Sequence, residues 1–249
     1  MIKKAFTLAE VLITIGIIGI VAAITLPAFV KYKRTQELKA QFMTTYSDLN
    51  QIAKKFYLDY GITVPEYTQR TPPNFGDLSA NWLKFVHTIF PSYYTQIVKR
   101  GQVSTGQSYL QSLHPIHLMN GKTTSYTCDN SGFKVDASGK MYVFNDSPYA
   151  GDNGPIVCVD INGGKGPNRY GYDYFIFIFT LDGMVIPMGQ THAKNTTVTT
   201  WQYNFFRTGK EYCNPNSGYF PQQTACAYYA LIDKNPYDES KSYWKDFLK

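Results

Sequence analysis

The chain has 249 residues, of which 44% are hydrophobic and 17% charged, and its formal net charge is +6. This composition provides for a packed core and excludes a mostly disordered chain. The small positive excess does not indicate nucleic-acid binding by itself, because a mixed solvated surface explains it equally well. Tyr (21) and Phe (16) are abundant, which favours β structure and buried aromatic contacts.

The N-terminus contains the most informative pattern. Lys3 and Lys4 precede an apolar run, and no charged side chain occurs from Val11 to Val30. At about 1.5 Å per residue, about twenty helical residues span roughly 30 Å, the thickness of the hydrocarbon core of a bilayer. Glu10 lies near the start of this run, where an ionisable group is costly in lipid, so we expect it to have a function.

A short motif joins the basic leader to the apolar run. Its residues are Phe6, Thr7, Leu8, Ala9 and Glu10. With Gly19 and Pro27 farther along, it resembles the N-terminus of type IV pilins and of the pseudopilins of type II secretion, which have a helix glycine and a kinking proline there. The resemblance is close over residues 1–30 and looser up to residue 60. One residue departs from the family pattern, since Ala5 stands where the leader usually ends in Gly.

The resemblance implies how the chain is processed and assembled. A prepilin peptidase would cut between Ala5 and Phe6, and the new amine of Phe6 would be N-methylated. The carboxylate of Glu10 would pair with that amine on a neighbouring subunit, and Gly19 and Pro27 would also serve assembly. The implied partners are other pilin-like subunits, the peptidase, the assembly platform of the bacterial inner membrane and the lipid bilayer. The N-terminus would be cytoplasmic and the head extracytoplasmic, before incorporation into a filament in the periplasm or at the cell surface.

Two other interpretations of the N-terminal segment are a secretory signal peptide and a simple membrane anchor. A signal peptide has an apolar region of about 7–15 residues and a small-residue cleavage site, and the run in this chain is longer. A simple anchor agrees with the positive-inside rule. Neither interpretation gives Glu10 a role.

In chain order, the predicted parts are a leader at residues 1–5, a transmembrane helix at 6–30, its amphipathic continuation at 31–60, and a globular head at 61–249. The continuation is amphipathic because apolar residues recur at steps of three and four. These residues are Leu38, Phe42, Tyr46, Leu49, Ala53, Phe56 and Tyr60. Pro27 should kink or loosen the helix, and Gly61 should cap it.

The head is predicted to be an α+β domain in which an antiparallel sheet packs on the long helix, as in pilins. A short helix is expected at 80–90 and a polar loop at 100–107. Strands are expected at 133–135, 141–144, 155–160, 172–180 and 184–186, with turns at 136–139 and 182–183. In the strand at 172–180, Phe175, Phe177 and Phe179 share one face, and the helix would bury one face of this strand. Residues 191–249 should be aromatic and rich in loops.

Four cysteines, Cys128, Cys158, Cys213 and Cys226, indicate disulfides in a chain that leaves the cytosol. Several pairings are open, and we favour Cys128–Cys158 and Cys213–Cys226 because each closes a local loop. The second pair also resembles the C-terminal disulfide loop of pilins. Free buried thiols are the alternative.

A candidate metal site follows the strand at 155–160. Asp160 and Asn162, followed by glycines, resemble the opening of a calcium loop, and Asp173 would supply a later ligand. Some pseudopilins hold calcium in a loop beside the sheet, so Ca²⁺ is the one cofactor considered. An Asx-rich turn that caps its own backbone is the alternative. Other nearby candidates are Asp152 and Asn153.

Other motifs are weaker. His114 and His117 have metal-like spacing, but Pro115 between them predicts a surface loop. No motif indicates an enzyme. A group of aromatic residues would form either a binding face or part of the core: Tyr203, Phe205, Phe206, Tyr212, Tyr219 and Phe220.

The sequence therefore predicts a structural subunit of a type IV pilus-like or type II secretion pseudopilus filament. The alternatives are a minor pilin whose head acts as an adhesin or binding module, and a membrane-tethered domain that does not assemble.

Overall fold

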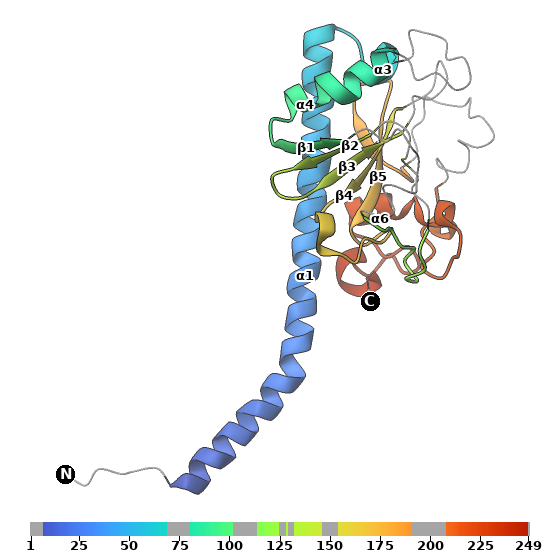
Figure 1. The fold of residues 1–249 in the computed structure, drawn as a ribbon. Coiled ribbons are helices and arrows are strands. Elements are labelled where there is room, and N and C mark those ends of the chain that lie inside the picture. The colour runs from blue at the N-terminus through green and yellow to red at the C-terminus, as the bar shows by residue number, and fades with distance from the viewer. Residues whose placement is uncertain are drawn as a thin grey trace. The chain divides into compact units, whose positions relative to one another are not determined.

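The computed structural model describes residues 7–68, 80–101, 114–124, 128, 132–145, 154–190 and 208–248. Its internal contacts separate two compact units, Met1–Glu37 and Leu38–Lys249. One helix, α1 (Leu8–Tyr60), contributes to both units. The second unit is the head, in which a sheet lies beside the C-terminal half of α1 (Figure 1).

Helix α1 begins and ends close to the predicted positions. It continues through Pro27 without interruption, so the predicted kink stays a prediction. Gly61 follows the last residue with a φ of +68°, and its N–H donates to the carbonyl of Tyr57 at 2.9 Å. This left-handed conformation favours glycine, and it confirms the predicted cap.

The predicted apolar stripe forms one side of the core of the head. Five of its residues are buried: Leu38, Phe42, Leu49, Ala53 and Phe56. Tyr46 is partly buried against the same core. Tyr60 departs from the prediction, because it is 40% exposed and stacks on the ring of Phe56 at 4.5 Å. The stripe is thus confirmed except for its last residue.

The sheet has six antiparallel strands in sequence order. They are β1 (Ile97–Gly101), β2 (Phe133–Asp136), β3 (Met141–Phe144), β4 (Ile156–Asp160), β5 (Tyr174–Phe179) and β6 (Val185–Pro187). The predicted hairpin of β2 and β3 is confirmed, with Gly139 at a φ of +92° in its turn. The predicted polar loop at 100–107 was wrong for its first two residues, because backbone pairing with β2 places Arg100 and Gly101 in β1. Residues 102–107 lie outside the described residues.

Both faces of the sheet are buried. Phe175, Phe177 and Phe179 belong to the core that contains the stripe of α1, and the rings of Phe42 and Phe175 lie 4.7 Å apart. The opposite face of β5 belongs to a second buried cluster, which also contains Ile116 and Cys128. The helix therefore buries one face, as expected, and residues between β1 and β2 in the chain help to cover the other.

Short helices complete the head. They are α2 (Val64–Thr68), α3 (Ala80–Lys84), η1 (Phe85–Ile89), α4 (Phe90–Tyr93), η2 (Gly163–Lys165), η4 (Lys210–Tyr212), η5 (Phe220–Gln223), α6 (Cys226–Ile232) and η6 (Tyr243–Phe247). The segment from α3 to α4 corresponds to the predicted helix at 80–90. Helix α6 lies in the region that we expected to be rich in loops. Trp244 of η6 is buried, and its ring lies 5.7 Å from the ring of Phe42.

Candidate functional site

The N-terminal half of α1 exposes its apolar side chains. From Leu8 to Val30, the large hydrophobic residues are 41–78% exposed, and Glu10 is the one charged residue in this range. Within the described residues, α1 is the one helix long and apolar enough to cross a membrane. This property agrees with the predicted transmembrane segment. The cleavage residues Ala5 and Phe6 lie outside the described residues.

Glu10 is held at the start of α1 by a capping box, a motif that our sequence reasoning missed. Its Oε2 accepts hydrogen bonds from the backbone N–H and the hydroxyl of Thr7, both at 2.8 Å. The Glu10 N–H donates in return to Oγ1 of Thr7 at 3.3 Å. A Thr followed three residues later by a Glu, directly before an apolar run, is the sequence signal that predicts this arrangement.

The glycines of α1 have no packing role within the described residues. A Cβ atom built at Gly16 or Gly19 would meet no other atom within 4 Å. Glycine inside a helix costs about 1 kcal/mol relative to alanine. Nothing in the described part of the chain offsets this cost.

Both predicted disulfides are present. Cys128–Cys158 has a Cα–Cα distance of 5.9 Å and links residue 128 to β4. Cys213–Cys226 has a Cα–Cα distance of 4.6 Å and links the residue after η4 to the first residue of α6. All four cysteines are fully buried and each is bonded to its partner, so the alternative of free buried thiols is wrong.

The three predicted calcium ligands lie together. Asp160 ends β4, Asp173 directly precedes β5, and both side chains are fully buried. Asn162 connects them, because its N–H donates to Asp160 Oδ1 at 3.1 Å and its Nδ2 donates to Asp173 Oδ2 at 3.2 Å. Backbone N–H groups of Asn168 and Arg169 donate to Asp173 at 3.0 and 2.6 Å. The Asx-rich turn that we considered as the alternative is therefore present.

A histidine joins this acid cluster. Nε2 of His114 lies 2.6 Å from Oδ2 of Asp160, and its side chain is 12% exposed. The predicted surface loop was therefore wrong for His114, because the buried carboxylate of Asp160 draws the imidazole inward. Ile116, in the same stretch, is fully buried as well.

Burial sets the protonation of the cluster. It raises the pKa of Asp160, and hydrogen bonding to His114 partly opposes this change. Burial and the nearby charge of Asp160 raise the pKa of Asp173 to about 7. Two negative carboxylates that lie close together in a buried site repel each other. A proton or a metal cation bound between them would therefore stabilise the site.

The cluster fits a calcium ion in part. The side-chain oxygens of Asn162 and Asn168 are buried without a hydrogen-bond partner, and oxygen ligands are those that Ca²⁺ prefers. In contrast, the described residues contain no group of three His, Cys, Asp or Glu side chains placed to hold a metal. Asn162 also directs Nδ2, rather than Oδ1, toward Asp173 Oδ2 and the Gly166 carbonyl, at 3.2 and 3.3 Å. Rotation of this amide would exchange Nδ2 and Oδ1. The Asn162 Oδ1 would then lie beside Asp173 Oδ2 and the Gly166 carbonyl oxygen, which brings three oxygens together. Asp152 and Asn153 lie outside the described residues.

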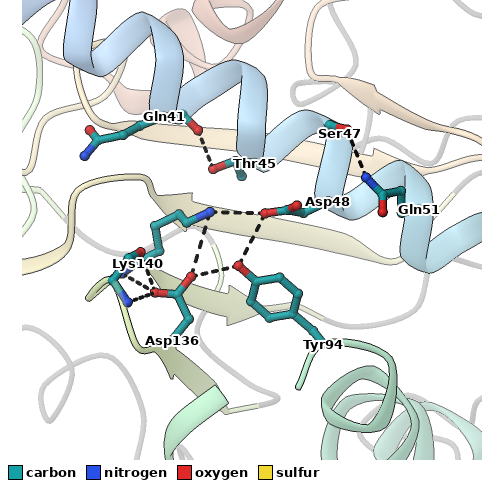
Figure 2. A network of polar contacts seen from close by, with 9 residues as sticks. Gln41, Thr45, Ser47, Asp48, Gln51, Tyr94, Asp136 and Lys140 are labelled. Carbon is teal, nitrogen blue, oxygen red and sulfur yellow. Dashed lines mark hydrogen bonds and ion pairs between the residues drawn. The ribbon is translucent and has the colours of Figure 1, made fainter. Parts of the chain in front are cut away.

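A second polar network joins α1 to the β2–β3 hairpin (Figure 2). Nζ of Lys140 lies 3.2 Å from Asp48 of α1 and 3.8 Å from Asp136 of β2. The Tyr94 hydroxyl donates to Asp136 at 2.8 Å and also contacts Asp48 at 3.3 Å. Asp136 Oδ1 accepts from Ser138 and from the Lys140 N–H. These donors satisfy the hydrogen-bonding capacity of the Asp136 carboxylate. The contact of Lys140 with Asp48 joins the hairpin to α1.

The described aromatic residues of the C-terminal region do not form one face. Tyr219 is 55% exposed, whereas Phe220 packs against the second buried cluster and stacks with Tyr170 at 6.2 Å. Tyr203, Phe205 and Phe206 lie outside the described residues.

No protein-family model, curated protein or solved structure matches the chain. Function is therefore inferred from the N-terminal motif and from the geometry of the described residues.

Proposed function

We propose that the chain is a structural subunit of a type IV pilus-like or type II secretion pseudopilus filament, assembled through the N-terminal half of α1. The observation that carries this proposal is an exposed apolar helix with one carboxylate, Glu10, in its first turn. Such a helix needs apolar surroundings, which the bilayer supplies before assembly and neighbouring helices supply after it.

Glu10 is the assembly residue. After cleavage between Ala5 and Phe6, the methylated amine of Phe6 is positively charged and pairs with Glu10 of a neighbouring subunit. The capping box supports this role, because it holds the carboxylate at the end of the helix where a new N-terminus would lie. Both bonds from Thr7 go to Oε2. The second oxygen, Oε1, remains for a cation of another subunit.

Close packing of helices supports the same proposal. The exposed glycines Gly16 and Gly19 lack a role within the described chain. Small residues allow helix backbones to approach each other in an apolar environment. Gly19 therefore lies at a contact between subunits, and Pro27, which removes one backbone hydrogen bond, allows the helix to adjust there.

Calcium binding by the head is a second part of the proposal. Asp160, Asn162 and Asp173 would hold the ion, which would supply the positive charge that the two buried carboxylates lack. Two observations support calcium binding. The Oδ1 of Asn162 is buried without a hydrogen-bond partner, and the pKa of Asp173 is raised. The bound ion would stabilise the junction between β4 and β5.

Replacement of Glu10 tests the assembly role. Glu10→Gln keeps the shape of the side chain and removes its charge, so incorporation into filaments should fail while the chain stays in the membrane. The matched control is Glu37→Gln, an exposed acid farther along α1. Normal incorporation of Glu10→Gln would show that the Glu10 carboxylate is not needed for assembly, and a wild-type chain that never enters filaments would be a membrane-tethered domain.

A further inference from the structure

Three cations directly follow the apolar run of α1. These cations are Lys31, Lys33 and Arg34, and all three are exposed. Two exposed aromatic residues accompany them: Phe29 precedes Lys31, and Tyr32 lies between the two lysines. The nearest acid on the N-terminal side is Glu10, and the next on the C-terminal side is Glu37. We call Lys31, Lys33 and Arg34 the interfacial cations.

The interfacial cations lie on different sides of the helix, and Lys33 points back toward its apolar part. Successive residues of an α-helix are separated by about 100°, so these three positions lie on different sides of α1. Side chains of a helix tilt toward its N-terminus. Lys33 shows this direction, because its Nζ lies 5.8 Å from the centre of the Phe29 ring. Neither Lys31 nor Lys33 forms an ion pair within the described part of the chain.

Phosphate groups occupy this depth in a bilayer. The apolar run from Val11 to Val30 is long enough for the hydrocarbon core, so the residues that follow it reach the headgroups. Aromatic side chains are typical of this interface. Ammonium and guanidinium groups bind phosphate oxygens through charge-assisted hydrogen bonds.

We propose that the interfacial cations form a binding site for acidic phospholipid headgroups, in the leaflet at the C-terminal end of the span. This site rests on the proposed insertion of α1 into the membrane. An acidic lipid is favoured over a zwitterionic lipid because its phosphate charge is not neutralised within the same headgroup. The bound lipids hold α1 at a fixed depth until the subunit leaves the membrane.

Lipid selectivity tests the proposal. The full chain is reconstituted in phosphatidylcholine bilayers with spin-labelled phosphatidylglycerol or phosphatidylcholine, and the motionally restricted fraction of each probe is measured. We expect at least about a threefold preference for the acidic probe, which falls toward no preference in the K31Q/K33Q/R34Q variant and in high salt. The control K54Q/K55Q/K84Q removes the same number of exposed charges from the head and should keep the preference.

Three results would overturn the site. One is a wild-type chain without preference, and another is a K31Q/K33Q/R34Q variant that keeps the preference. The third is loss of the preference when inorganic phosphate replaces chloride at equal ionic strength, because the cations would then bind the free ion. Restriction of neither probe would instead show that α1 is not inserted, which contradicts the membrane span itself. Circular dichroism of each variant checks that the fold is kept.

Discussion

The side-chain amide of Asn50 pairs with both backbone groups of Val185. Oδ1 of Asn50 accepts from the Val185 N–H at 2.9 Å, and its Nδ2 donates to the Val185 carbonyl at 3.0 Å. Val185 begins β6, which is the last strand of the sheet. The amide therefore satisfies the edge of the sheet as a neighbouring strand would, and it fixes α1 to that edge.

Loss of this pairing should destabilise the head. We expect Asn50→Ala to lower the free energy of unfolding by about 1–3 kcal/mol, since it leaves two backbone groups without partners. The isosteric Asn50→Asp should have a similar effect, because a carboxylate faces the Val185 carbonyl. Thermal unfolding of the full chain in detergent measures both variants. Gln51→Ala is the matched control, as Gln51 is exposed and contacts Ser47 on the same helix. Equal stability of Asn50→Ala and the control would contradict this role.

The network around Lys140 should couple α1 to the β2–β3 hairpin (Figure 2). Lys140→Met removes the cation beside the fully buried Asp136 and should cost about 2–3 kcal/mol. Lys54→Met removes an exposed lysine of α1 and should have little effect. A double-mutant cycle with Asp48→Asn measures the coupling across the 3.2 Å contact. Strict additivity of the two substitutions would show that the contact does not couple helix and hairpin.

The raised pKa of Asp173 predicts a stability that depends on pH. Burial and the charge of Asp160 raise this pKa from 3.8 to about 7. Between these two values the folded chain keeps a proton that the unfolded chain has released, so stability falls as the pH rises through this window. Asp173→Asn has no proton to lose, and its free energy of unfolding should depend less on pH there. Unfolding at a series of pH values tests this, with the exposed Glu239→Gln as control. The same slope in all three chains would contradict the prediction.

Calcium should replace the proton at neutral pH. If the ion binds the acid cluster, Ca²⁺ at about 100 times its Kd raises the free energy of unfolding by about 2.7 kcal/mol. A chelator should reverse this effect, and the gain should shrink in acid as protons compete for Asp173. Asp160→Asn and Asp173→Asn should lose the response. If the melting temperature of the wild-type chain is the same with Ca²⁺ and with chelator, the acid cluster does not bind Ca²⁺.

Local sequence patterns predicted the parts of the fold that depend on local spacing. The steps of three and four identified Phe42, Leu49 and Phe56 as core residues, and a Gly-containing turn between two apolar stretches identified the hairpin. Both disulfides followed from the preference for local loops, at sequence separations of 30 and 13 residues.

Contacts between distant residues could not be predicted in this way. His114 and Asp160 are 46 residues apart, and Asn50 and Val185 are 135 residues apart. No periodicity within one segment indicates such partners, because they depend on how the segments pack. β1 was missed because its polar residues pair through the backbone, and residue type says little about that pairing. The capping box of Thr7 and Glu10 was visible in the sequence, but we assigned Glu10 to assembly alone.

Intact mass spectrometry of the chain purified from bacterial membranes checks processing and assembly together. We expect a product that begins at Phe6, is one methyl group heavier than the unmodified cleaved chain, and is recovered in filaments. A chain that still begins at Met1, or a cleaved chain without the methyl group that is found as monomers alone, would contradict it.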